Sequence, residues 1–259
     1  MSIGFFDSGV GGITVLAEAL KQLPKENYIY YADTDHVPYG TKSKEQVKKF
    51  VLEAVDFLAA QGIKALVVAC NTATSIAIND LRAKYSFPIL GMEPAVKPAV
   101  ERNGTKRILV TATPLTLREE KYQNLIARFD KAHLVDGLAL PELVEFAENF
   151  VFDPGIIQAY LQQKLVGYDL SSYGTVVLGC THFPFYKNCF RKVFPPGTDI
   201  IDGSTGTVNY LKKILLERDL CQNGQGKVIY YSSGRKQAAN IKYAKYLRIL
   251  QVANSASQA

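Results

Sequence analysis

Short apolar runs alternate along the chain with longer segments in which apolar residues recur every three or four positions. The short runs predict strands, and the longer segments predict amphipathic helices. The predicted strands are Ile3–Phe6, Tyr28–Ala32, Ala65–Ala69, Ile89–Gly91, Arg107–Thr111, His133–Asp136, Val176–Leu178, Thr198–Ile201 and Lys227–Tyr231. The predicted helices are Gly12–Leu23, Lys44–Gln61, Ala73–Lys84, Pro94–Arg102, Leu115–Phe129, Pro141–Phe150, Gly155–Leu165, Tyr186–Phe194 and Gly206–Glu217, and Val252–Ala259 is expected to be a frayed tail.

The alternation of strands and helices predicts an α/β fold with mostly parallel sheets, because a helix returns the chain to the start of the next parallel strand. The run Ala65–Ala69 is apolar at every position. This is expected of a strand that helices cover on both faces.

Two distant segments share one pattern. Val67–Thr72 and Val177–His182 each read as a buried strand followed by a cysteine and small polar residues. The pattern predicts two similar α/β domains, each with a cysteine, Cys70 or Cys180, at the end of a strand. Ligands of open α/β sheets bind beyond the carboxyl ends of strands, so we expect the active site in the cleft between the domains.

Composition is that of an ordinary globular protein, with 47% hydrophobic and 21% charged residues among 259. The start of the chain lacks the pattern of a signal peptide, and no apolar run approaches the ~20 residues of a membrane span. We therefore expect a cytoplasmic protein without a membrane partner. The net charge of +6 is spread over helix faces without interleaved aromatic residues, which disfavours a nucleic-acid partner.

The chain has four cysteines, which are expected to be free thiols in a reducing compartment. None belongs to a Cys-x-x-Cys pair, so no metal site is expected. Cys189 and Cys221 lack a functional context and are interpreted as structural.

Cys70 and Cys180 each stand between a strand end and an expected helix start, where the helix dipole favours a thiolate and lowers the thiol pKa. A thiol that titrates near neutrality can both accept and donate protons. Two such thiols on opposite faces of a substrate carbon would invert its configuration. His182 follows Cys180 by two residues and could exchange a proton with it.

The segment Asp7–Gly12 follows the first predicted strand and is rich in glycine. A nicotinamide-binding loop is one alternative, but Thr14 stands where G-x-G-x-x-G requires its third glycine. The pattern favours a different role, in which the glycines let the backbone approach the carboxylate of a small ligand. Ser8, Asn71, Thr72 and Thr181 add neutral hydrogen-bond donors for such a ligand.

Together these segments resemble the glutamate racemases. The motifs that carry the resemblance are Phe6–Gly12, Tyr31–Asp33, Val37–Thr41, Ala69–Ala73 and Leu178–Pro184, and they occur in the family's order along nearly the whole chain. The resemblance implies a cofactor-independent enzyme of two α/β domains, residues 1–97 plus 206–259 and residues 98–205. It also implies interconversion of L- and D-glutamate for peptidoglycan synthesis, and a possible homodimer.

The resemblance also implies roles for individual residues. Cys70 and Cys180 match the catalytic pair, and Cys180 would act on L-glutamate. Asp7 and His182 match the residues that assist them. The family's assisting glutamate lies in a Pro-Leu-Val-Glu run, for which Glu145 in Pro141–Glu145 is the nearest equivalent. The implied substrate-binding residues are Asp7, Ser8, Pro38, Tyr39, Gly40, Asn71, Thr72, Thr113, Thr181 and His182.

Three alternatives remain open at this point. An aspartate racemase or another racemase of the same superfamily would use the same two cysteines, and pocket size is not readable from sequence. A protein-binding role, such as gyrase inhibition, would need an extension or a surface patch. A dehydrogenase would bind nicotinamide.

Overall fold

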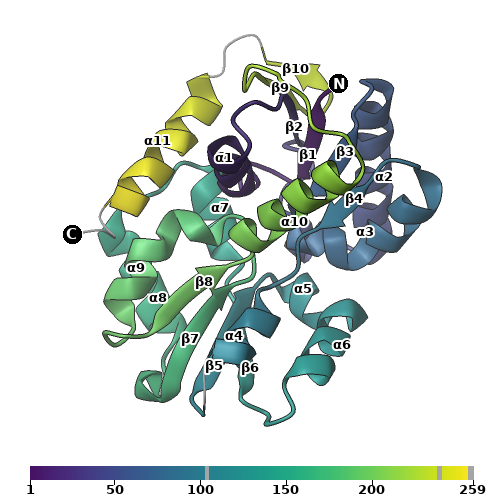
Figure 1. The fold of residues 1–259 in the computed structure, drawn as a ribbon. Coiled ribbons are helices and arrows are strands. Elements are labelled where there is room, and N and C mark those ends of the chain that lie inside the picture. Colours follow the sequence, from purple (N-terminus) through teal and green to yellow (C-terminus); the bar gives the residue numbers. More distant parts are fainter. Residues whose placement is uncertain (103–104, 238–240, 256–259) are drawn as a thin grey trace.

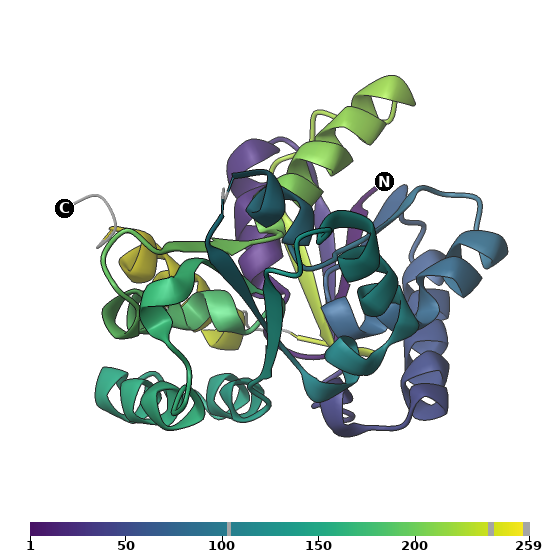
Figure 2. The same ribbon diagram turned by 90° about the horizontal axis from the view of Figure 1, so that it is seen from below.

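The computed structural model describes residues 1–102, 105–237 and 241–255. Two separate sheets organise the chain (Figures 1 and 2). The first has the strand order β10-β9-β2-β1-β3-β4, and the second has the order β6-β5-β7-β8. The strands are β1 (Ile3–Asp7), β2 (Tyr28–Ala32), β3 (Ala65–Val68), β4 (Ile89–Gly91), β5 (Arg107–Ala112), β6 (Val135–Ala139), β7 (Tyr173–Leu178), β8 (Asp199–Asp202), β9 (Val228–Ser232) and β10 (Arg235–Lys236).

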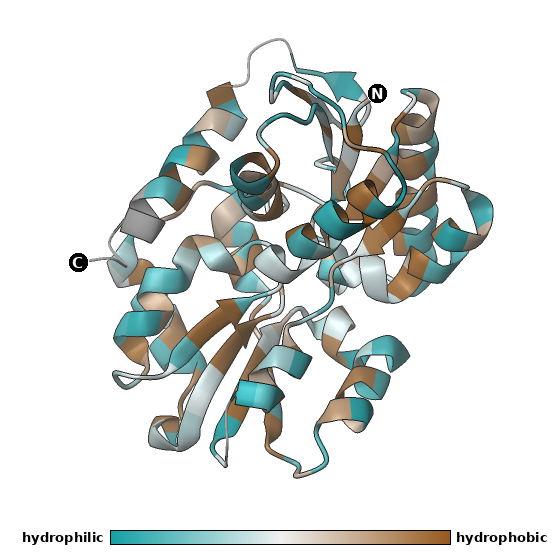
Figure 3. Ribbon diagram, viewed as in Figure 1, coloured by the Kyte–Doolittle hydropathy of each residue, from teal (hydrophilic) through white to brown (hydrophobic). Residues whose placement is uncertain are grey.

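Every strand pairing is parallel except that of β10 with β9, which confirms the predicted α/β class with mostly parallel sheets. β3 is apolar and buried at every position, as expected of a strand covered on both faces, and β1 is buried throughout, including Asp7 at its end. Brown strands and largely teal outer helix faces show the same division of hydropathy (Figure 3).

Helices connect the strands and cover the sheets. They are α1 (Ile13–Gln22), α2 (Lys44–Ala60), α3 (Asn71–Lys84), α4 (Val96–Arg102), α5 (Pro114–Arg118), α6 (Glu120–Phe129), α7 (Glu142–Glu148), α8 (Pro154–Lys164), α9 (Lys187–Val193), α10 (Ser204–Glu217) and α11 (Ile241–Ser255). Three short 3₁₀ turns join them, η1 (Tyr39–Thr41), η2 (Leu170–Ser172) and η3 (Phe183–Tyr186).

Three predicted elements differ from the structure. The helix expected over Leu115–Phe129 is two helices, because Glu119 between them is extended with ψ 138°. The carboxylate of Glu119 pairs with Lys44 at 3.0 Å. The strand expected from His133 begins at Val135, because His133 adopts the left-handed φ of 54°. The expected frayed tail is also wrong in part, since α11 continues to Ser255; residues 256–259 lie outside the described part.

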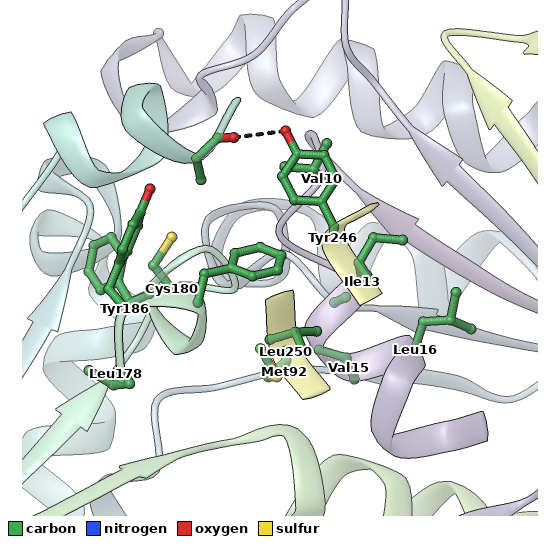
Figure 4. Close-up of a cluster of buried hydrophobic side chains, with 14 of the residues drawn as sticks. Val10, Ile13, Val15, Leu16, Met92, Leu178, Cys180, Tyr186, Tyr246 and Leu250 are labelled. Atoms are coloured by element: carbon green, nitrogen blue, oxygen red, sulfur yellow. Dashed lines mark hydrogen bonds between the residues drawn. The ribbon is translucent and has the colours of Figure 1, made fainter. Parts of the chain in front are cut away.

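One hydrophobic cluster joins the two halves of the molecule. It includes Val10 and Ile13 beside the first sheet, and Leu178 and Cys180 at the end of a strand of the second. Figure 4 shows these side chains in one cluster, with Val10 and Ile13 beside Tyr246 of α11 and Leu178 and Cys180 on its other side. The carboxyl ends of β1, β3 and β7 therefore meet across a packed junction.

Candidate active site

A narrow pocket lies where the ends of the two sheets face each other. Both Cys70 and Cys180 belong to its wall. Cys70 follows β3 of the first sheet, and Cys180 follows β7 of the second. The residues that line it are Ser8, Tyr39, Gly40, Cys70, Asn71, Thr72, Thr113, Val144, Cys180, Thr181 and His182. The apolar wall formed by Val144 had no signal in the sequence beyond its place on the buried face of α7.

Cys70 occupies the cap position before α3. Its Sγ accepts a hydrogen bond of 3.4 Å from the Ala73 amide and lies 3.7 Å from Ser8 Oγ. These contacts favour a thiolate, but burial and then the nearby Asp7 carboxylate outweigh them and raise the pKa of Cys70 to about 12. The pKa lowering expected from the helix start is therefore wrong for Cys70.

Cys180 lies in the loop between β7 and η3, close to an imidazole. Its Sγ is 3.7 Å from Nδ1 of His182, a side chain that is 1% exposed. Burial disfavours a charged imidazole, but the hydrogen bonds to Cys180 and Glu148 together raise the pKa of His182 well above its usual value. A protonated His182 thus stands beside one of the two sulfurs.

Glu148, the last residue of α7, is the carboxylate that holds His182. Its Oε1 accepts hydrogen bonds from His182 Nε2 at 2.9 Å and from the Val10 amide at 2.6 Å. Although burial opposes ionisation, these donors and the charge of His182 keep the pKa of Glu148 below its usual value. Sequence reasoning missed Glu148.

Glu145, the residue expected in this role, lies elsewhere. It is exposed on α7, one turn before Glu148. The buried face of α7 is marked by Leu143, Val144 and Ala147, and Glu148 stands four residues after Val144, at the edge of that face. This helical periodicity was the signal that could have distinguished the two glutamates.

The glycine-rich loop contacts the protein's own side chains. A Cβ on Gly9 would lie 1.8 Å from Glu148 Oε1, and one on Gly11 would lie 2.3 Å from Thr181 Oγ1. The loop can therefore approach the second half of the molecule only because it lacks side chains at these positions. The glycines therefore have a structural role that the sequence did not indicate, and their approach to a ligand carboxylate stays a prediction.

Asp7 ends β1 beneath the pocket and is fully buried. Its carboxylate accepts hydrogen bonds of 3.0 Å from the Gly9 amide and from Thr181 Oγ1. Burial raises the pKa of Asp7 to about 6, although the charge of His182 and these two donors oppose the rise. Asp7 is thus poised to titrate near neutrality between the two halves of the site.

We expect Asp7→Asn to gain stability relative to the wild type as the pH rises. The folded protein holds the Asp7 proton more tightly than the unfolded chain, so ionisation between about pH 4 and pH 6 destabilises the wild type alone. The difference in unfolding free energy should move by about 2 kcal/mol in favour of the variant between about pH 4 and pH 7.5. Urea unfolding at the two pH values measures it.

Asp35→Asn is the control for this prediction. Asp35 is an exposed residue whose pKa is lowered by its hydrogen bonds to Arg235. Its replacement should not produce the gain with rising pH. A constant difference between the wild type and Asp7→Asn at both pH values would contradict the prediction.

Polar side chains fill the rest of the pocket wall. Both side-chain polar atoms of Asn71 are buried without a hydrogen-bond partner among the described residues. Thr72, Thr113 and Thr116 form a triangle of hydroxyls 2.9–3.0 Å apart that joins α3 to α5. An unsatisfied buried amide is costly, so Asn71 is suited to hydrogen-bond a polar ligand.

Tyr39 and Gly40 enter the pocket from η1, while the neighbouring Pro38 is half-buried and outside the lining set. The Tyr39 hydroxyl donates to Asp33 at 2.6 Å, and Gly40 packs against Thr113, which a Cβ would approach to 2.5 Å. This contact closes the pocket between η1 and α5.

In the described part of the chain, no three His, Cys, Asp or Glu side chains gather in a way that could hold a metal ion. No helix within residues 1–102, 105–237 and 241–255 combines the length and the apolar character needed to cross a bilayer.

Comparison with known proteins gives a consistent result. The profile of the family described as Asp/Glu/Hydantoin racemase matches residues 8–211. The glutamate racemase of Halothermothrix orenii is 58% identical over 253 residues, which cover 97% of this chain and 99% of that protein. Glutamate racemase 2 of Bacillus subtilis is 56% identical over 254 residues, with 97% and 96% covered. The crystal structure of Escherichia coli glutamate racemase in complex with L-glutamate and the activator UDP-MurNAc-ala has a TM-score of 0.80 at 30% identity, with 97% and 95% covered.

Proposed function

The chain belongs to the Asp/Glu/Hydantoin racemase family, and from this premise we propose that it is a cofactor-independent glutamate racemase that supplies D-glutamate for peptidoglycan synthesis. One observation carries the proposal: two cysteines from different sheets line a single pocket together with buried hydrogen-bond donors. The glutamate racemases named above are similar over nearly their whole length, which favours glutamate over aspartate as the substrate.

The reaction needs one sulfur on each face of the substrate carbon. A thiolate takes the α-proton, so that the Cα–H bond breaks, an S–H bond forms, and the electron pair passes into the α-carboxylate. The opposite thiol then donates its proton to the other face and becomes the thiolate. Because Cys70 is held as a thiol while Cys180 lies beside protonated His182, the resting site is suited to L-glutamate, with Cys180 as base and Cys70 as acid.

The weak acidity of the α-proton is the main barrier to this reaction. The α-carboxylate gains negative charge in the transition state, and preorganised donors in a dry pocket stabilise such charge best. We assign this role to Ser8, Asn71 and Thr72 of the pocket wall, whereas the hydroxyl of Thr181 already donates to Asp7 and holds that carboxylate. Thr113, which lies beside Thr72, and the Tyr39–Gly40 segment complete the wall of the same pocket.

Three further features belong to the same proposal. The domains would comprise residues 1–97 with 206–259 and residues 98–205, since β5–β8 all lie within the second range. The enzyme would work in the cytoplasm, and it would form a homodimer. Size-exclusion chromatography with light scattering tests the dimer.

Proton exchange in deuterated water tests the function directly. The purified protein, without added cofactor, should replace the α-proton of glutamate by deuterium, and the circular dichroism of either enantiomer should decay to zero. Aspartate run in parallel should react at least about tenfold more slowly, because its shorter side chain leaves buried polar groups unpaired. Faster turnover of aspartate, or a requirement for nicotinamide or pyridoxal phosphate, would overturn the proposal.

A further inference from the structure

Tyr246 of the C-terminal helix α11 packs directly against the segments that carry Glu148 and His182. Its side chain is 1% exposed, and its hydroxyl donates to the Ala147 carbonyl of α7 at 2.8 Å (Figure 4). The Glu148 carbonyl lies 3.5 Å from the same hydroxyl. Tyr246 therefore contacts the last turn of α7. The side chain of Glu148, which binds His182, extends from the same turn.

The ring of Tyr246 contacts the other member of this pair as well. Its centroid is 5.5 Å from that of Phe185, in the 3₁₀ turn that directly follows His182. It also packs edge to face on Phe150, just beyond α7, at 5.3 Å. One side chain of α11 thus touches the two segments that carry Glu148 and His182.

The end of α7 has a backbone that needs such support. Phe150 adopts a left-handed φ of 61°, which is unfavourable for a residue with a bulky side chain. The Phe150 amide caps the helix by donating to the Ala147 carbonyl at 3.0 Å, the same oxygen that accepts from Tyr246. Without the Tyr246 hydroxyl, the Ala147 carbonyl oxygen would still accept a hydrogen bond from the Phe150 amide. We therefore expect the end of α7 to shift, but we do not expect a buried carbonyl to lose all its partners.

We propose that Tyr246 is a positioning residue that fixes the contact between Glu148 and His182, and through it the Cys180 side of the site. The inference rests on the proposed function. It gives the C-terminal helix a role in the reaction although none of its residues lines the pocket.

A change at Tyr246 would act on the reaction through the charged groups that set the pKa of His182. Glu148 faces it from α7, Asp7 from β1 and Cys180 from the loop after β7, while Lys242 of α11 acts on Glu148. Of these contacts, the one made by Glu148 depends on the end of α7. If the last turn of α7 moves, the hydrogen bond between Glu148 and His182 weakens, and the pKa of His182 should fall toward its ordinary value.

Tyr246→Phe and Tyr243→Phe form a matched pair for the test. Tyr243 lies one turn earlier on α11, and its ring packs on Tyr230 and Tyr30 instead of on the end of α7. Both variants lose one buried hydroxyl from the same helix and keep their rings. The readouts are kcat for glutamate and the His182 titration by NMR of ¹⁵N-histidine protein, assigned with His182→Gln among only three histidines.

Tyr246→Phe should lower kcat by about fivefold and the pKa of His182 by about half a unit, whereas Tyr243→Phe should change neither. Phe185→Leu, which keeps the hydroxyl and removes the ring contact, should shift His182 in the same direction. A Tyr246→Phe protein with reduced kcat and an unchanged His182 titration, or equal shifts in both tyrosine variants, would overturn the inference. Absence of racemisation by the wild type would instead refute the proposed function.

Discussion

Alanine at either Cys70 or Cys180 is expected to lower kcat for glutamate racemisation by about 10³-fold or more. Each thiol supplies the proton transfer on one face of the substrate carbon, and the remaining thiol would have to cross the pocket to take its place. The loss should appear from both enantiomers, because every turnover uses both sulfurs. Circular dichroism of D- and L-glutamate measures it.

Two controls separate chemistry from folding in this experiment. Cys70→Ala also removes the cap contact to the Ala73 amide, which costs about 1 kcal/mol of stability, whereas Cys70→Ser retains an acceptor there. The serine variant should therefore fold like the wild type and remain inactive, because a hydroxyl is a far weaker acid than a thiol. Cys189→Ala, at a buried cysteine outside the pocket, should stay active. Full racemisation by either single variant would refute the two-base mechanism.

The sequence predicted the parts of the site that depend on local pattern. Cys70 and Cys180 each follow a buried parallel strand, and parallel strands place their carboxyl ends at one edge of a sheet. That two such edges face each other was inferred from the repeated strand–cysteine pattern. The same logic placed Ser8, Asn71, Thr72 and Thr181 near the cysteines, because each lies within one or two residues of a strand end or a cysteine.

The local sequence pattern could not predict contacts between segments that are distant along the chain. The partner of the Val10 amide is a glutamate 138 residues away, so the sequence could not show that the glycine loop serves an internal contact. The pKa of Cys70 depends on how deeply the pocket buries it and on the Asp7 carboxylate, neither of which is local. The helix break at Glu119 likewise coincides with an ion pair to Lys44, a contact between distant segments.

Glu148→Gln is expected to lower kcat by about 10²-fold. The glutamine oxygen can still accept from the Val10 amide and from His182 Nε2, so the shape of the site is retained and only the charge is removed. Without that charge the pKa of His182 falls, and the imidazolium beside Cys180 is lost at a lower pH than in the wild type. The alkaline limb of the profile of kcat against pH should therefore move to lower pH.

Glu145→Gln provides the matched control, because it makes the same chemical change three residues earlier on the same helix. Glu145 is exposed, so its replacement should leave kcat within about twofold of the wild type and the pH profile unmoved. A large loss in Glu145→Gln with normal activity in Glu148→Gln would restore Glu145 as the assisting carboxylate. It would also require the end of α7 to shift when substrate binds, by a rotation of about 60° and a translation of about 4.5 Å, which separate residues three positions apart on a helix.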